Sequence, residues 1–103
     1  MEKVIIRTDS AGVHFGELKE EQISNSGHYA VTLVNARRIW QWSGANCISE
    51  LATLGSSDHK DCKISIPVSS IKLMAIEIVK MSDEAYNDLS SIDFWVTTKK
   101  ELA

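Results

Sequence analysis

Arginine and tryptophan are concentrated in one short segment of the chain, Asn35–Asn46. This segment carries the adjacent Arg37 and Arg38, followed by Trp40 and Trp42. A guanidinium group matches two phosphate oxygens with parallel hydrogen bonds, and an indole face stacks on a nucleobase. The combination therefore predicts a binding site for a small anionic nucleotide.

Small and polar residues extend this pattern at the end of the segment. Ser43, Gly44 and Asn46 precede apolar residues at helical spacing, so we expect them at a helix start. Backbone N–H groups that are exposed at such a start attract anions. The predicted ligand-binding residues are thus Arg37, Arg38, Trp40, Trp42, Ser43, Gly44 and Asn46.

A strand through this segment would separate its arginines. Side chains alternate between the faces of a strand, which groups Arg38 with Trp40 and Trp42. Arg37 falls with Ile39 on the opposite face, so Arg38 is the first candidate for a phosphate contact. The same residues also suit a second interpretation, in which the tryptophans are core or subunit-interface aromatics with Arg38 stacked between them.

Metal binding is the next chemistry to weigh. His59 and Cys62 stand three residues apart, and Cys47, His14 and His28 could converge on them. Structural zinc sites normally show a second close ligand pair, which this sequence lacks. We therefore predict no metal site and interpret both cysteines as free thiols.

The sequence contains no familiar catalytic motif. It has neither a Gly-x-Ser-x-Gly elbow nor a glycine-rich phosphate loop. Asp58, His59 and Asp61 are its only clustered acid and base groups, and their polar surroundings predict a solvated loop. We therefore expect no enzymatic activity and no cofactor.

The composition is that of an ordinary folded domain. The 103 residues are 44% hydrophobic and 24% charged, which predicts a single domain over residues 1–103. The net charge of -3 disfavours duplex nucleic acid as a partner. No apolar run is long enough to span a bilayer, and Met1–Arg7 lacks the apolar stretch of a signal peptide. We expect a cytoplasmic protein without membrane contact.

Alternating β-formers and turn signals predict the elements that must position these side chains. Strands are expected over 4–8, 13–18, 28–34, 37–42, 62–66, 71–79 and 94–97. The third and fourth of these are separated by a turn at Asn35–Ala36. Short helices are expected over 46–54 and from an N-cap at Ser82, followed by a frayed tail over 99–103. The predicted fold class is α+β, a compact and mostly antiparallel β-sheet of about six to seven strands with two short helices.

A family resemblance rests on separate stretches of the chain. They are Val4–Thr8 with Ser10–Gly16, Asn35–Asn46 with Glu50-Leu51, and, more weakly, Ala75–Ile78. With the pattern Asn-Ala-Arg-Arg-x-Trp-x-Trp-x-Gly-Ala, the chain resembles a family of small, uncharacterised proteins encoded by tailed phages. Small phage proteins of this size without enzyme motifs also resemble immune-evasion sponges, which are homo-oligomers that sequester nucleotide signals of bacterial defence systems.

The resemblance and the arginine-tryptophan segment together imply a function. We expect a phage-encoded, noncatalytic homo-oligomer that captures a cyclic dinucleotide or a related signal in a pocket at a subunit boundary. It would act in the cytosol of the host bacterium and withhold the signal from antiviral defence. The alternative is a protein–protein adaptor that inhibits a host enzyme, with the same tryptophans as interface anchors.

Overall fold

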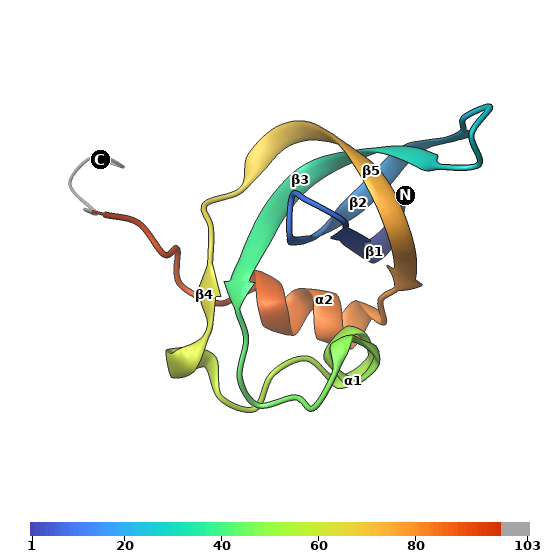
Figure 1. Ribbon diagram of the computed structural model, residues 1–103. Helices are drawn as coiled ribbons and strands as arrows, with labels where there is room; N and C mark the ends of the chain where they lie inside the picture. Colours follow the sequence, from blue (N-terminus) through green and yellow to red (C-terminus); the bar gives the residue numbers. More distant parts are fainter. Residues whose placement is uncertain (98–103) are drawn as a thin grey trace.

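Five β-strands and two α-helices make up residues 1–97, the part of the chain that the computed structural model describes (Figure 1). The strands are β1 (Glu2–Thr8), β2 (Val13–Ile23), β3 (Tyr29–Gln41), β4 (Lys63–Ile64) and β5 (Val68–Lys80). The helices are α1 (Ile48–Leu54) and α2 (Asp83–Ser90), with a short 3-10 helix at His59–Asp61. The predicted α+β class is confirmed. Neither of the two described α-helices is long and apolar enough to cross a membrane.

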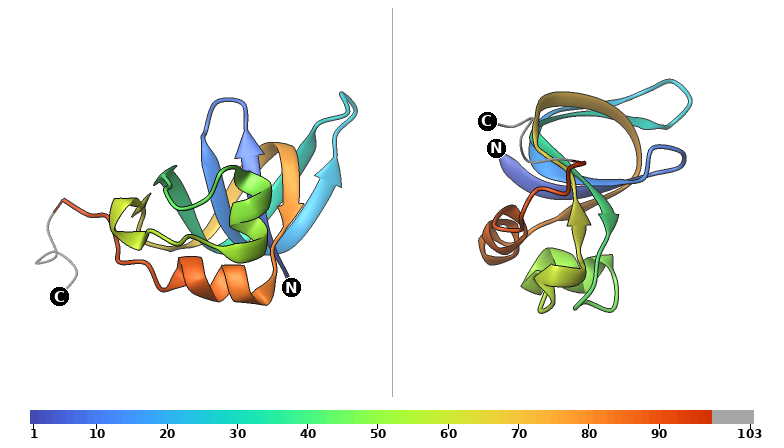
Figure 2. Two further views of the ribbon diagram at one scale, coloured as in Figure 1. Left: turned by 90° about the horizontal axis from the view of Figure 1, so that it is seen from below. Right: turned by 90° about the vertical axis from the view of Figure 1, so that its left-hand side faces the viewer.

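Four of the strands close into a small barrel (Figure 2). Antiparallel pairs join β1 to β2, β2 to β3, β3 to β5 and β5 back to β1, while the short β4 lies on the edge of β3. Closing so few strands requires strong bending, and a break in the β2–β3 register between Phe15 and Glu17 contributes to it. Gly16 stands at this break, where a Cβ atom would lie 3.0 Å from the Val34 carbonyl oxygen. A larger residue would push β2 away from β3.

The barrel and the helices enclose separate hydrophobic cores that share β1. Val4 and Ile6 point into the barrel, where they pack with Val31, Leu33, Ala36, Leu73 and Ala75. Ile5 points the opposite way and packs in the helix-side core, which includes Phe15, Ile39, Leu51, Ile64, Ala85, Leu89 and Ile92. Because successive residues of a strand face opposite sides, a strand between two cores is apolar without interruption. This explains the run Val4-Ile5-Ile6.

The structure has fewer strands than predicted, in part because two of the predicted strands form one continuous strand. The expected strands over 28–34 and 37–42 form the continuous β3. In place of a turn between them, Asn35 is a single left-handed residue (φ 52°) within the strand. Its side-chain Nδ2 donates to Glu17 Oε2 at 2.8 Å, which holds it in this conformation. Asparagine tolerates positive φ better than most residues, so Asn35, which suggested a turn in the sequence, forms a bulge within the strand instead.

The chain after α2 has less regular structure than predicted. The expected strand over 94–97 is reduced to one parallel bridge between Ile64 and Phe94. The Trp95 N–H continues it with a 2.9 Å hydrogen bond to the Ile64 carbonyl. The predicted tail over 99–103 lies outside the described residues.

Both predicted helices are present, with different N-terminal caps. The Ser82 hydroxyl accepts a 3.0 Å hydrogen bond from the Ala85 N–H, which confirms Ser82 as the N-cap of α2. Helix α1 begins two residues later than expected, and its N-cap, Cys47, makes no side-chain cap bond. The Glu50 carboxylate instead accepts a 2.6 Å hydrogen bond from the Asn46 N–H.

Candidate functional site

Arg37 lies inside the fold, where backbone carbonyl groups surround its guanidinium. Only 4% of the residue is exposed, because it shares the helix-facing side of β3 with Ile39. Its Nε donates to the Ser65 carbonyl at 2.7 Å and its Nη2 donates to the Ile92 carbonyl at 2.9 Å. Longer hydrogen bonds reach the carbonyls of Ile64, Leu89, Ser90 and Asp93. Arg37 thus ties the C-terminal end of α2 to the chain around β4.

This network removes Arg37 from the candidate ligand-binding residues. A cation is favoured at the C-terminal end of a helix, where carbonyl groups lack partners. The Phe94 ring covers the guanidinium, with its centroid 5.1 Å from the Arg37 Cζ. We therefore no longer expect a phosphate contact from Arg37, while its predicted placement on the face opposite Arg38 is confirmed.

Ser43, Gly44 and Asn46 are engaged within the fold as well. Ser43 Oγ donates to Asp58 Oδ2 at 2.9 Å, and this bond lowers the pKa of Asp58. Gly44 has a φ of 78°, and a Cβ atom there would lie 2.5 Å from the backbone nitrogen of Asp58. The Asn46 N–H already binds the Glu50 carboxylate. Carboxylates therefore occupy the place predicted for an anion, and we no longer expect a ligand contact at this helix start.

Trp42 leaves the face that Arg38 and Trp40 share. Strand β3 ends at Gln41, and beyond it Trp42 is partly buried against the helix-side core. The interpretation as a core aromatic therefore holds for Trp42. It does not hold for Trp40, which is 66% exposed.

Arg38 is the exposed cation of the segment. Its backbone is fixed by Ser65, whose hydroxyl accepts from the Arg38 N–H at 2.8 Å and whose N–H donates to the Arg38 carbonyl at 2.9 Å. Its guanidinium makes no hydrogen bond or ion pair with any of residues 1–97. A positively charged group on a fixed backbone is thus available to a ligand.

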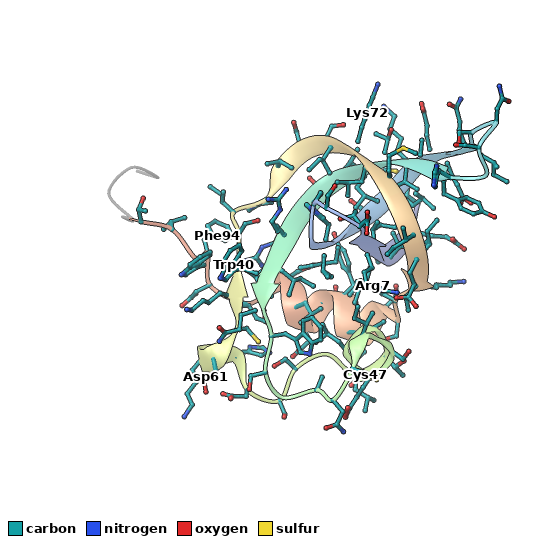
Figure 3. The ribbon with its side chains drawn as sticks, viewed as in Figure 1. Arg7, Trp40, Cys47, Asp61, Lys72 and Phe94 are labelled. Carbon is teal, nitrogen blue, oxygen red and sulfur yellow. The ribbon has the colours of Figure 1, made fainter. Side chains whose placement is uncertain are left out.

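Trp40 stacks on Trp95, a residue that the sequence patterns did not assign to the site. The ring centroids are 5.8 Å apart and the planes differ by 22°. Trp95 is itself 49% exposed, and Lys63 Nζ lies 5.7 Å from its ring centroid. We call Trp40 and Trp95 the indole pair. Figure 3 labels Trp40 and the adjacent Phe94, which project from the same side of the fold.

The position of Trp95 depends on the buried Arg37. Arg37 binds the carbonyls of Ile92 and Asp93, which brings the chain after α2 alongside β4. Trp95 follows within two residues and is fixed by its N–H bond to Ile64. No local signal in the sequence reveals this pairing, because the partners are far apart along the chain.

An open groove begins at Trp95. It has a volume of about 420 Å³ and runs past Asp93 to His59 and Lys60. Lys60 adds a positive charge near the indole pair, while Asp93 adds a negative one. The groove therefore extends the candidate site without a strong preference for charge.

The loop before β4 is less solvated than expected. His59 Nε2 lies 3.0 Å from both carboxylate oxygens of Asp88, which fastens this loop to α2. Cys47 and Cys62 are both free thiols, as predicted. Within residues 1–97, no three His, Cys, Asp or Glu side chains are grouped so that they could hold a metal ion.

The comparisons with known proteins give a family but no function. The chain significantly matches no curated protein and no solved structure. A family model described as a domain of unknown function, DUF6948, matches residues 1–89. The match contains all five strands, Arg38 and Trp40, and it ends before Trp95. The expected membership of an uncharacterised family is thus confirmed, and the chain belongs to the DUF6948 family.

Proposed function

We propose that the protein binds a small anionic nucleotide at the indole pair and holds it without converting it. The observation that carries this proposal is the exposed, stacked Trp40 and Trp95 with the cations Arg38 and Lys63 beside them. An exposed indole face gains free energy by stacking on a base of any kind. The cations supply the local attraction for phosphate that a net charge of -3 does not.

The spacing of these groups suits different parts of one nucleotide. Side chains two residues apart on one face of a strand are separated by about 7 Å, which places Arg38 within a nucleotide's length of Trp40. Lys63 Nζ lies 5.7 Å from the centroid of the Trp95 ring. Each indole of the pair therefore has a cation close to it that can meet a phosphate group of a stacked nucleotide.

The biological role that we propose is sequestration of a cyclic dinucleotide or a related signal by a phage-encoded protein in the host cytosol. Such a protein acts by mass action, so it needs nanomolar affinity, about -12 kcal/mol. A single exposed indole pair covers only one side of a ligand. We therefore propose that a second copy of the chain completes the pocket, and light scattering that reports a monomer with ligand bound would contradict this.

An adaptor function is the second candidate, favoured by the same exposure of the indole pair. Tryptophan and arginine are the residues that most often anchor protein–protein interfaces. A host enzyme could bury the indole pair as fully as a nucleotide could. The two functions differ in one respect, because an adaptor has no affinity for free nucleotides.

Calorimetric titration with cyclic dinucleotides and with linear mononucleotides tests the proposal. We expect binding that Trp95→Ala weakens, because half of the stacking surface is removed. Lys63→Ala should also weaken binding, whereas Lys72→Ala, an exposed lysine on β5, should leave it unchanged. The bound nucleotide should be recovered intact by chromatography after heating. Absence of binding throughout the panel would favour the adaptor, and degraded nucleotide would show an enzyme.

A further inference from the structure

The barrel is not filled at the end where Arg38 lies. A cavity of about 250 Å³ opens there, which we call the barrel mouth. Its walls are formed by Ala36, Ile66, Val68 and Ile71, with His14 and Arg38 as its charged or titratable members and Ser65 as a further polar one. The mouth of a barrel is a common place for a ligand, because an apolar interior there meets solvent.

His14 on β2 and Arg38 on β3 are neighbours across this antiparallel pair of strands. They are directly opposite in the β2–β3 register, and His14 is also opposite Ile6, which points into the barrel. Directly opposed residues of an antiparallel pair share one face. Both side chains therefore lie on the inner face of the barrel, at its open end.

The hydrogen bond of His14 determines what its ring offers to a ligand. His14 is only 1% exposed, and its Nε2 lies 2.8 Å from the Ala11 carbonyl oxygen. A carbonyl oxygen only accepts, so Nε2 carries the proton. Nδ1 has no hydrogen-bond partner among residues 1–97. In that range every fully buried side-chain nitrogen or oxygen atom has a partner, so Nδ1 is not fully enclosed. Nδ1 is thus an unpaired acceptor on a ring that lines the barrel mouth, although almost all of the residue is buried.

The neutral form of this ring is the favoured one. Burial lowers the pKa of His14, and the nearby charge of Arg38 lowers it further, against the opposing effect of the bond to Ala11. The barrel mouth therefore presents the His14 acceptor, the charged Arg38 donor and mainly apolar walls, with the Ser65 hydroxyl already bound to the Arg38 N–H and the Ile66 carbonyl. A planar heterocycle with an N–H donor next to an acceptor atom complements this set, and nucleobases have such edges.

The size of the barrel mouth limits the ligand to one ring system. Its volume of about 250 Å³ lies below the range of about 300 to 1,000 Å³ that is typical of pockets for drug-sized ligands. This space suits a single base and not a whole dinucleotide. The rest of a larger ligand would pass Arg38 and reach Trp40, two residues further along the same face.

We propose that the barrel mouth is a nucleobase subsite, which takes one base of a dinucleotide whose phosphate binds Arg38 and whose other base stacks on the indole pair. This inference rests on the proposed nucleotide-binding function, and it adds a site that forms hydrogen bonds with the edge of a base. The indole pair accepts any base, whereas the edge of His14 selects bases that can donate to Nδ1. Discrimination between bases is therefore assigned to the barrel mouth.

The test uses ring-nitrogen NMR of His14 with the four ribonucleosides as probes, because nucleosides carry a base and no phosphate. We expect at least one nucleoside at millimolar concentration to shift the Nδ1 resonance of His14. Val68→Trp fills the barrel mouth from its exposed rim and should weaken that binding roughly tenfold or more. Met74→Trp is the matched control, on an exposed position of the same strand outside the barrel mouth, and should have no effect.

A second variant separates the acceptor from the shape of the barrel mouth. In His14→Gln the amide nitrogen can replace Nε2 as the donor to Ala11, while the Nδ1 acceptor is lost. Nucleoside affinity should fall although the fold persists. If cyclic dinucleotides perturb the indole N–H signals of Trp40 but no nucleoside shifts His14, the subsite is wrong and the proposed function stands. If nucleosides shift His14 and no nucleotide reaches the indole pair, the subsite stands without that function.

Discussion

Arg37 and Arg38 are neighbours in the sequence but lie in opposite environments on the two sides of β3. On the helix-facing side, Arg37 is surrounded by carbonyl groups that accept from its guanidinium. On the side of the barrel mouth, Arg38 has a fixed backbone and a guanidinium without a partner in residues 1–97. The comparison shows that residue type identifies a cation suited to phosphate, while the surrounding backbone decides whether that cation is available. Arg37 holds together the part of the fold that carries the indole pair, and Arg38 is the cation that we propose contacts the ligand.

The largest effect that we expect distinguishes the two arginines by stability. Arg37→Ala leaves several buried carbonyl groups without a donor and should lower the free energy of unfolding by about 3 to 5 kcal/mol. Arg38→Ala removes an exposed side chain and should change it by less than about 0.5 kcal/mol. Urea denaturation of both variants measures the difference. Equal destabilisation would contradict the assignment of separate roles.

The second prediction concerns ligand affinity. Arg38→Ala should weaken the binding of the tightest nucleotide by about 2 kcal/mol, or roughly 30-fold, because a charged phosphate partner is lost. Arg38→Lys keeps the charge but not the planar fork, and it should restore only part of the affinity. Calorimetric titration at one ionic strength gives both values. If Arg38→Ala binds every tested nucleotide as the wild type does, Arg38 is not a ligand contact.

The third prediction compares the two tryptophans of the segment. Trp40→Ala should reduce nucleotide affinity by about 1 to 2 kcal/mol through lost stacking and should barely change the thermal midpoint. Trp42→Ala should lower the thermal midpoint instead, because Trp42 packs against the helix-side core. Thermal melts must accompany both titrations. A large loss of stability in Trp40→Ala would show that its exposure does not persist in solution.

The smallest effect is a dependence of stability on pH that originates at the barrel mouth. Burial lowers the pKa of folded His14 below its ordinary value of 6.5, so the unfolded chain binds more protons whenever the pH is below that value. The contribution of His14 to stability is therefore complete above pH 6.5 and declines as the pH falls toward the folded pKa. Urea midpoints measured on either side of this range should differ less in His14→Gln. An unchanged pH profile in that variant would exclude His14 as the source.

Sequence patterns predicted the general organisation of the fold and one half of the candidate site. Period two along β3 correctly separated Arg37 from Arg38, because alternation is a local property of a strand. The fate of Arg37 was not predictable, since its acceptors include Ile92, 55 residues away along the chain. The role of Trp95 was not predicted for the same reason, because its stacking on Trp40 depends on where the chain after α2 runs.

The loop half of the segment shows a different limit. Ser43 and Gly44 have the residue types of a phosphate loop, and the local pattern gave no reason to reject that role. Their partners lie in the loop before β4, where Asp58 accepts from Ser43 and packs against Gly44. A glycine that permits two backbone segments to approach each other cannot be distinguished, by sequence alone, from one that permits approach of a ligand.

The left-handed Asn35 determines toward which face of β3 each of the following side chains points. Before it, the barrel core receives the odd-numbered Val31 and Leu33; after it, the even-numbered Ala36. A chain without this one-residue slip would invert the two rows of side chains, so that Arg37 would enter the barrel mouth and Arg38 would meet the end of α2. The two arginines would thus exchange environments without any change in either residue, so Asn35 decides which of them is buried and which lines the barrel mouth.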